Sequence, residues 1–196
     1  MVVAHGAGAG QKSPFMVRTA TGLAARGVAA ATFDFPYMAA RPRRAAPDRP
    51  DVLERSWREA IDRAREAFGT LPLFIGGKSM GGRIASHVAT QGAEGIAGVV
   101  FLGYPLHPPG KPEQRRDAHL PAIAAPMLFV QGSRDAFGTA DEIRALLPRL
   151  QRATLHEVAG GDHSFAIRGR GAPSPDATLA GILDVVRHWM TAGRPG

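Results

Sequence analysis

One stretch of the chain, residues 71–83, limits the possible folds more than any other. Its sequence, LPLFIGGKSMGGR, begins with an apolar run, continues with the pattern Gly-x-Ser-x-Gly and leads into helical spacing of apolar residues. A buried strand, a tight turn with Ser79 at its apex and a following helix make up a nucleophile elbow. Gly77 and Gly81 fit this geometry because the residues two before and two after the serine crowd each other unless they lack side chains.

Two other interpretations of this stretch remain open at this point. With 24 glycines among 196 residues, the pattern arises by chance in roughly one such sequence in ten, so Ser79 could be incidental in a glycine-rich turn. Gly77, Lys78 and Ser79 also match the end of a phosphate-binding P-loop. That loop needs a glycine five positions before Gly77, where this chain has Pro72, which argues against it.

Apolar runs alternate with helical patterns along the whole chain. The expected strands are residues 2–4, 28–35, 71–75, 96–104, 126–131 and 153–159. Helix starts are expected at Ser13 with Pro14, and at two capping boxes, Asp51 with Glu54 and Thr139 with Glu142. Residues 36–50 and the proline-rich residues 105–121 are expected to be loops. The alternation predicts an α/β three-layer sandwich, with a mainly parallel six-stranded sheet and helices on both faces.

Three chemically matched residues follow the ends of different predicted strands. Ser79, Asp135 and His163 occur in that order, and right-handed crossovers bring the carboxyl ends of parallel strands to one edge. A serine hydroxyl needs a base, and imidazole suits the task because its pKa is about 6.5. A carboxylate then orients the imidazole and stabilises its charged form. The pattern predicts a Ser-His-Asp catalytic relay.

The remaining histidines and the neighbouring acids fit this role less well. We expect packing or surface roles for the other histidines, at positions 87, 107, 119, 156 and 188. Asp162 is adjacent to His163, and Asp141 lies in a first helical turn. For the oxyanion, the backbone N–H groups of Met80 and of Ala7 are the expected donors, with Gly8 in reserve. We expect His5 to be a structural hydrogen-bonding residue.

Composition excludes several kinds of site. The chain has no cysteine, which rules out disulfides, thiolate metal sites and a cysteine nucleophile. The relay requires neither a metal nor a cofactor. The net charge is +7, but the arginines are scattered, so we expect a solvated basic surface and no nucleic-acid partner. No apolar run reaches the ~20 residues of a membrane span, and the first residues do not look like a secretory signal. We expect one domain over residues 1–196, in the cytoplasm.

Four segments resemble the α/β-hydrolase superfamily, across nearly the whole chain. They are residues 5–10 (HGAGAG), 77–83 (GKSMGGR), 132–135 (GSRD) and 161–165 (GDHSF). The likeness is greatest to a small, lidless, dienelactone-hydrolase-like branch, to which residues 35–38 and 47–50 also conform. That branch is similar to a testis-expressed protein and to the hydrolase-like region of a chromatin-complex regulatory subunit. The resemblance implies the strand order second, first, third, fourth, fifth, sixth, with the oxyanion loop beside the nucleophile strand.

The chain departs from that branch in two places. Relatives usually have further strands before the His-Gly loop, so we expect that these strands are absent or that the start was assigned late. The excursion after the fourth strand, where a lid often inserts, is short, which implies an open pocket and small or flexible acyl substrates.

The sequence therefore predicts a serine hydrolase that acts on a small-molecule carboxylic ester or thioester. The alternatives are a non-catalytic binding module on the same scaffold and, third, phosphate or nucleotide binding through Gly77 to Ser79. Arg41, Arg43 and Arg44 could favour an acidic substrate, although solvated loop charge also explains them. The acyl group, the leaving group and the oligomeric state stay open.

Overall fold

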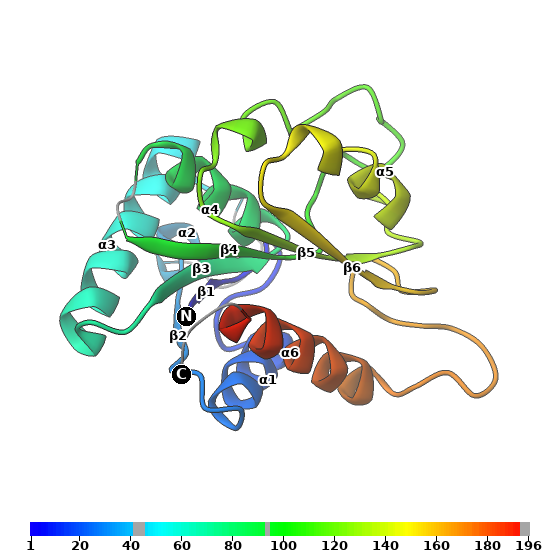
Figure 1. Ribbon diagram of the computed structural model, residues 1–196, viewed down its shortest axis with the longest axis horizontal. Helices are drawn as coiled ribbons and strands as arrows, with labels where there is room; N and C mark the ends of the chain where they lie inside the picture. Colours follow the sequence, from blue (N-terminus) through cyan, green and yellow to red (C-terminus); the bar gives the residue numbers. More distant parts are fainter. Residues whose placement is uncertain (41–45, 93–94, 193–196) are drawn as a thin grey trace.

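The computed structural model describes residues 1–40, 46–92 and 95–192. Within these residues, six strands form one sheet in the order β2-β1-β3-β4-β5-β6, and every adjacent pair is parallel (Figure 1). This confirms the predicted six-stranded sheet and the strand order implied by the resemblance. The strands are β1 (Val2–Ala4), β2 (Ala31–Phe33), β3 (Leu73–Lys78), β4 (Ile96–Leu102), β5 (Met127–Gly132) and β6 (Ala153–Val158).

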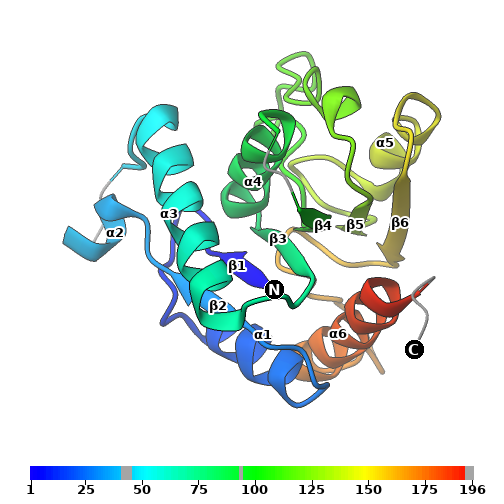
Figure 2. The ribbon, with the colours of Figure 1, turned by 60° about the vertical axis from the view of Figure 1, so that its left-hand side comes forward.

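Helices cover both faces of this sheet, as Figures 1 and 2 show. On one face lie α1 (Pro14–Ala24) and α6 (Pro175–Thr191), which contact each other. On the other lie α3 (Pro50–Phe68), α4 (Met80–Thr90) and the short α5 (Ala140–Arg144). Two buried apolar clusters correspond to the two faces, and Trp57 is central to one and Leu183 to the other. The structure thus has three layers, as predicted.

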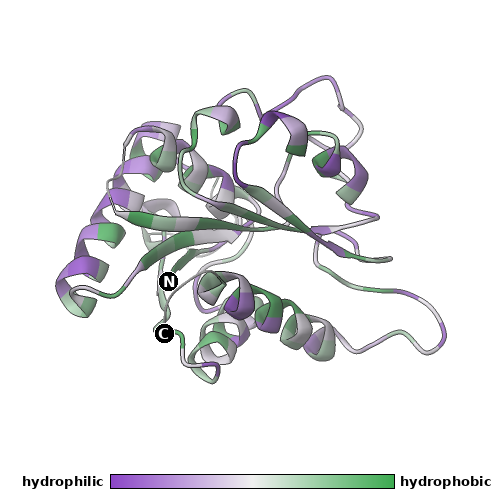
Figure 3. Cartoon of the chain, viewed as in Figure 1, coloured by the Kyte–Doolittle hydropathy of each residue, from purple (hydrophilic) through white to green (hydrophobic). Residues whose placement is uncertain are grey.

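Hydropathy follows these layers in Figure 3, where apolar residues run along the strands and polar ones mark the outer side of α3. The inner stripe of α3 consists of Leu53, Trp57, Ile61 and Ala64, all buried, at the helical spacing seen in the sequence. Val99 to Leu102 of β4 are buried throughout, as expected for a strand covered on both faces. Within the described residues, no helix combines the length and the apolar character that crossing a bilayer demands.

Of the three predicted helix starts, one has the expected hydrogen bonds. At α5, the Thr139 hydroxyl accepts a bond from the Glu142 N–H at 3.3 Å, and the Glu142 carboxylate accepts one from the Thr139 N–H at 2.8 Å. Ser13 precedes α1, but its side chain caps nothing. The capping box at Asp51 is wrong, because α3 begins at Pro50, whose ring presets the helical φ and places Asp51 inside the first turn.

Several element boundaries differ from the prediction, among them that of β3, which spans Leu73–Lys78 where residues 71–75 were expected. The second strand has only three residues, because its partner β1 leaves the sheet after Ala4. The expected loop at 36–50 begins instead with a short helix, α2 (Pro36–Ala40), again with a proline at its first position. Beyond its start at Thr139, the apolar spacing of Ile143, Leu146, Leu147 and Leu150 predicts a longer helix, but α5 ends at Arg144 and is followed by a 3₁₀ turn, Leu147–Arg149. Pro148 prevents an α-helix from continuing there, because it lacks the N–H that the helix would use.

The remaining connections have little regular structure. Between β4 and β5, the proline-rich excursion contains the short 3₁₀ turn Leu120–Ala122, in agreement with the expected loop. The loop after β6 leads to α6, which starts at Pro175 with Ser174 as a true N-cap, since the serine hydroxyl accepts the N–H of Ala177 at 3.1 Å.

Candidate active site

Ser79 lies at the sharp turn between β3 and α4, with φ 50° and ψ −116°. Only one other non-glycine residue in the described ranges, Phe165, has a positive φ, and it follows His163 by two positions. Strained backbone of this kind persists only where the surrounding packing holds it. A Cβ on Gly77 would lie 2.2 Å from the carbonyl oxygen of Ala4, and one on Gly81 would lie 2.6 Å from it. Strand β1 therefore passes too close to the turn for side chains at either glycine.

The structure brings the three predicted relay residues together. The Ser79 Oγ lies 2.9 Å from Nε2 of His163, and Nδ1 of His163 lies 2.7 Å from Oδ2 of Asp135. They come from the loops after β3, β5 and β6, at one edge of the sheet. Because a carboxylate only accepts, Nδ1 carries the proton and Nε2 is free to accept from the serine hydroxyl.

Asp135 is held by a set of donors that the sequence analysis missed. Its side chain is fully buried, and it accepts hydrogen bonds from the Phe137 N–H at 2.8 Å and from Nε2 of Gln131 at 3.0 Å. The amide of Gln131 also accepts from the Tyr104 N–H at 2.8 Å, so its orientation is determined by the neighbouring strand. The available signal was a glutamine near the end of an otherwise apolar strand.

The side chain of Lys78, the residue before Ser79, contacts the backbone of His163. The Lys78 ammonium donates to the His163 carbonyl oxygen and lies 5.1 Å from the ring centre of Phe165 and 6.0 Å from that of Phe15. Burial lowers the pKa of Lys78 to about 8, although Asp135 and Asp162 partly oppose the shift. Lys78 thus holds the backbone of His163, and it is the last residue of strand β3 and not part of a phosphate-binding loop.

The two expected oxyanion donors, Ala7 and Met80, line the same cavity as Ser79. Met80 begins α4, and a Cβ on Gly6 would lie 3.6 Å from that of Ser79, so the loop after β1 passes over the nucleophile. Among the described residues, the N–H of neither residue donates a hydrogen bond to a backbone carbonyl. Both groups are therefore available to a ligand.

His5 has the structural position that was expected of it. It is completely buried, its Nε2 accepts the N–H of Phe35 at 3.1 Å, and its Nδ1 lies 2.8 Å from the carbonyl of Gly6. Burial lowers its pKa, and the hydrogen bond to Gly6 and the charge of Asp34 oppose this less strongly. The ring joins the loop above Ser79 to the end of β2.

The other histidines considered from the sequence do not take part in the relay. His107 pairs with Glu142 at 3.1 Å, and Nε2 of His119 contacts Oγ of Ser86 at 2.7 Å. Burial, with the nearby charges of His87 and Arg83, lowers the pKa of His119 to about 4. His156 and His188 lie on β6 and α6. Arg41, Arg43 and Arg44 fall outside the described residues.

A cavity of about 580 Å³ opens beside Ser79 and His163. Its lining combines apolar side chains, among them Phe15, Leu53 and Phe137, with the charged residues Asp48, Lys78, Arg83 and Arg116. No cluster of three or more His, Asp or Glu side chains in the described ranges is arranged to hold a metal ion.

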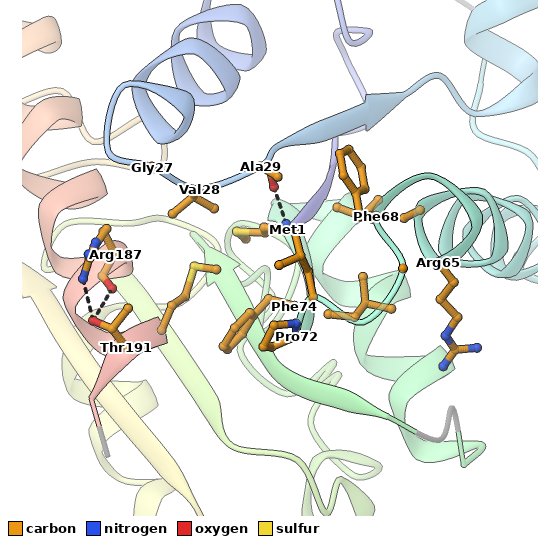
Figure 4. A pocket seen from close by; sticks show the side chains of 16 residues that line it. Met1, Gly27, Val28, Ala29, Arg65, Phe68, Pro72, Phe74, Arg187 and Thr191 are labelled. Atoms are coloured by element: carbon orange, nitrogen blue, oxygen red, sulfur yellow. Dashed lines mark hydrogen bonds between the residues drawn. The ribbon is translucent and has the colours of Figure 1, made fainter. Parts of the chain in front are cut away.

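A second cavity, of about 180 Å³, lies at the opposite ends of the strands (Figure 4). It is bordered by the beginnings of β1 and β3, near Met1 and Phe74, and by Val28, Phe68 and Arg187. None of the relay residues lines it. Its position at the amino ends of the strands separates it from the chemistry described above.

Comparisons with known proteins agree with this architecture. A family model described as an alpha/beta hydrolase domain matches residues 1–191. The dienelactone hydrolase from Anabaena variabilis ATCC 29413 superposes with a TM-score of 0.74 at 22% identity, over 97% of this chain and 84% of that one. Est1E from Butyrivibrio proteoclasticus, in a structure with bound ferulic acid, gives 0.72 at 15% identity, over 96% and 86%. A monoacylglycerol lipase from Paleococcus ferrophilus gives 0.70 at 17%, over 97% and 93%.

Proposed function

Because the chain belongs to the alpha/beta hydrolase family, we propose that it is a serine hydrolase that cleaves a carboxylic ester or thioester through an acyl-enzyme on Ser79. One observation carries the proposal: Ser79, His163 and Asp135 form a chain of two hydrogen bonds. The Ser79–His163 distance is 2.9 Å and the His163–Asp135 distance is 2.7 Å. Ser79 and His163 also line a cavity that is large enough for a small substrate. Esterases and a lipase among the structural neighbours support the same class of chemistry.

In the first step, Oγ of Ser79 would attack the carbonyl carbon while its proton moves to Nε2 of His163. The buried carboxylate of Asp135 then stabilises the imidazolium through Nδ1. The N–H groups of Met80 and Ala7 would donate to the oxyanion of the tetrahedral intermediate. The intermediate collapses with departure of the alcohol or thiol, which takes the proton from His163.

In the second step, water hydrolyses the acyl-enzyme, and His163 and Ser79 exchange the proton in the opposite direction. His163 accepts a proton from a water molecule that attacks the acyl-enzyme, and returns it to Oγ of Ser79 as the carboxylic acid leaves. These steps use the chain's own side chains and backbone, together with water and the substrate. A cavity with apolar walls limits the water around the oxyanion and so strengthens the hydrogen bonds made to it.

The test is labelling of the purified protein by a fluorophosphonate probe, followed by hydrolysis of p-nitrophenyl butyrate. The wild type should be labelled at Ser79, and Ser79→Ala should lose the label and several orders of magnitude in kcat/KM. Ser56→Ala is the matched control, because its hydroxyl donates to the Val52 carbonyl of its own helix and, within the described residues, lies outside the cavity beside Ser79. A folded Ser79→Ala protein with wild-type turnover would remove Ser79 from the mechanism. A folded wild type that takes no label would favour the non-catalytic binding module.

A further inference from the structure

Two arginine side chains in the cavity beside the relay form no ion pair with any acid of the described residues. Arg83 and Arg116 both line this cavity, and both are half-buried. Within the described part of the chain, neither guanidinium takes part in an ion pair or a side-chain hydrogen bond. The neighbouring Arg115 behaves differently, because it makes two hydrogen bonds to the carboxylate of Asp117, at 3.2 and 3.1 Å. The carboxylate of Asp117 is therefore already paired with Arg115, and Arg149 lies 3.9 Å from it.

This arrangement is unfavourable for the protein alone. Desolvation lowers the pKa of Arg83, and the positive charge of Arg116 lowers it further. Arginines on open surfaces avoid such a cost by extending into water or by pairing, as Arg26 does with Asp184 at 2.7 Å. Two like charges that have lost part of their water and have gained no partner would be stabilised by any anion that fits between them.

The other charged groups of the cavity do not neutralise the two arginines. Asp48 is the carboxylate in the cavity lining, and it accepts the Tyr37 N–H at 2.8 Å. Lys78 adds a further positive charge at neutral pH, since its pKa is about 8. The described lining thus holds three cationic side chains and one carboxylate in addition to His163.

We propose that the substrate is an ester or thioester that also carries a carboxylate, and that Arg83 and Arg116 bind this carboxylate. This inference rests on the proposed function. The N–H of Arg83 donates to the carbonyl of Ser79 at 3.0 Å, so the two residues are one helical turn apart on α4. The carboxylate would therefore lie a few carbon atoms from the carbonyl that Ser79 attacks. Guanidinium groups suit this role because each presents parallel N–H donors to both carboxylate oxygens.

The test compares two esters that differ only in the terminal group of the acyl chain: the p-nitrophenyl monoester of adipic acid and p-nitrophenyl hexanoate. In the wild type, kcat/KM should be higher for the adipate monoester. Arg83→Gln and Arg116→Gln should each lower the ratio of the two kcat/KM values about tenfold or more, as expected for a lost hydrogen bond between charged groups. Arg63→Gln is the control for net charge, because Arg63 is exposed on α3, and should keep the ratio.

A binding measurement separates this inference from the proposed function. Adipate should bind the Ser79→Ala protein in calorimetry, and the added substitution Arg83→Gln should weaken that binding about tenfold or more. Arginine-dependent binding in a protein that hydrolyses neither ester would keep the anion site and remove the hydrolase. Equal ratios in the wild type and both glutamine variants, together with no arginine-dependent adipate binding, would overturn the anion site even if hydrolysis persists.

Discussion

Replacing Lys78 by methionine should change how the stability of the protein depends on pH. The Lys78 ammonium lies near two aromatic rings, those of Phe15 and Phe165, and contacts the carbonyl of His163. Methionine has a similar length and no charge, so it keeps most of the apolar contacts and removes the group that titrates. The substitution therefore isolates the free-energy cost of keeping a charged amine in this position.

The size of the effect follows from the pKa shift. Burial lowers the pKa of Lys78 from 10.5 to about 8, while in the unfolded chain the amine stays near its ordinary value. Below pH 8 both states are protonated, and the folded state bears the full cost. Between pH 8 and 10.5 the unfolded state binds more protons, so stability rises with pH. Between pH 7 and 10, this group should add about 2 to 3 kcal/mol of stability to the wild type relative to Lys78→Met.

Urea denaturation at pH 7 and at pH 10, for the wild type and for Lys78→Met, measures this difference. The free energy of unfolding of the wild type should rise with pH relative to that of the variant, because all other titrating groups are shared and cancel. Lys111→Met is the control, since Lys111 is exposed and its removal should leave the pH dependence unchanged. If the wild type and Lys78→Met show parallel pH profiles, the amine is not desolvated as the structure indicates.

Two further substitutions test the relay and the turn that presents it. Asp135→Asn should lower kcat/KM by about 10³-fold or more with little change in melting temperature, because an amide no longer fixes the proton on Nδ1 of His163; retained activity would show that the hydrogen bond at 2.7 Å does not orient the base. Gly77→Ala should lower the free energy of unfolding by about 1–3 kcal/mol or more, since its Cβ would lie 2.2 Å from the Ala4 carbonyl oxygen. An unshifted urea midpoint for that variant would contradict the close approach of β1.

The sequence was informative where chemistry depends on chain order and local pattern. Ser79, Asp135 and His163 could be named because each follows a strand, and the carboxyl ends of parallel strands share one edge. The strand order itself came from the resemblance, since alternation alone does not determine which strands are neighbours. The Thr139 and Glu142 capping box was correct because both of its partners are local in sequence.

The residues that the sequence did not indicate act through contacts between distant segments. Gln131 of β5 can orient Asp135 because its own amide is held by the N–H of Tyr104, which follows β4. Lys78 contacts the carbonyl of His163, which is 85 positions away in the sequence. Arg83 and Arg116 look like ordinary helix and loop charges until the fold places them in one cavity, where neither forms an ion pair with an acid of the described residues. The helix start at Ser13 with Pro14 was correct, because both signals agree there. The start expected at Asp51 was wrong, because Pro50 sets the boundary and competes with the cap residues.

The packing of β1 against the elbow connects the two parts of the proposed oxyanion site. The carbonyl oxygen of Ala4 occupies the space that a Cβ on Gly77 or Gly81 would need, so strand and turn cannot shift independently without a clash or a gap. The loop that leaves β1 is therefore held close to Ser79, and a Cβ added at Gly6 would lie 3.6 Å from that of Ser79. Both proposed donors are backbone groups whose location follows from this contact, which explains why glycine is needed at the two positions even though neither glycine takes part in the chemistry.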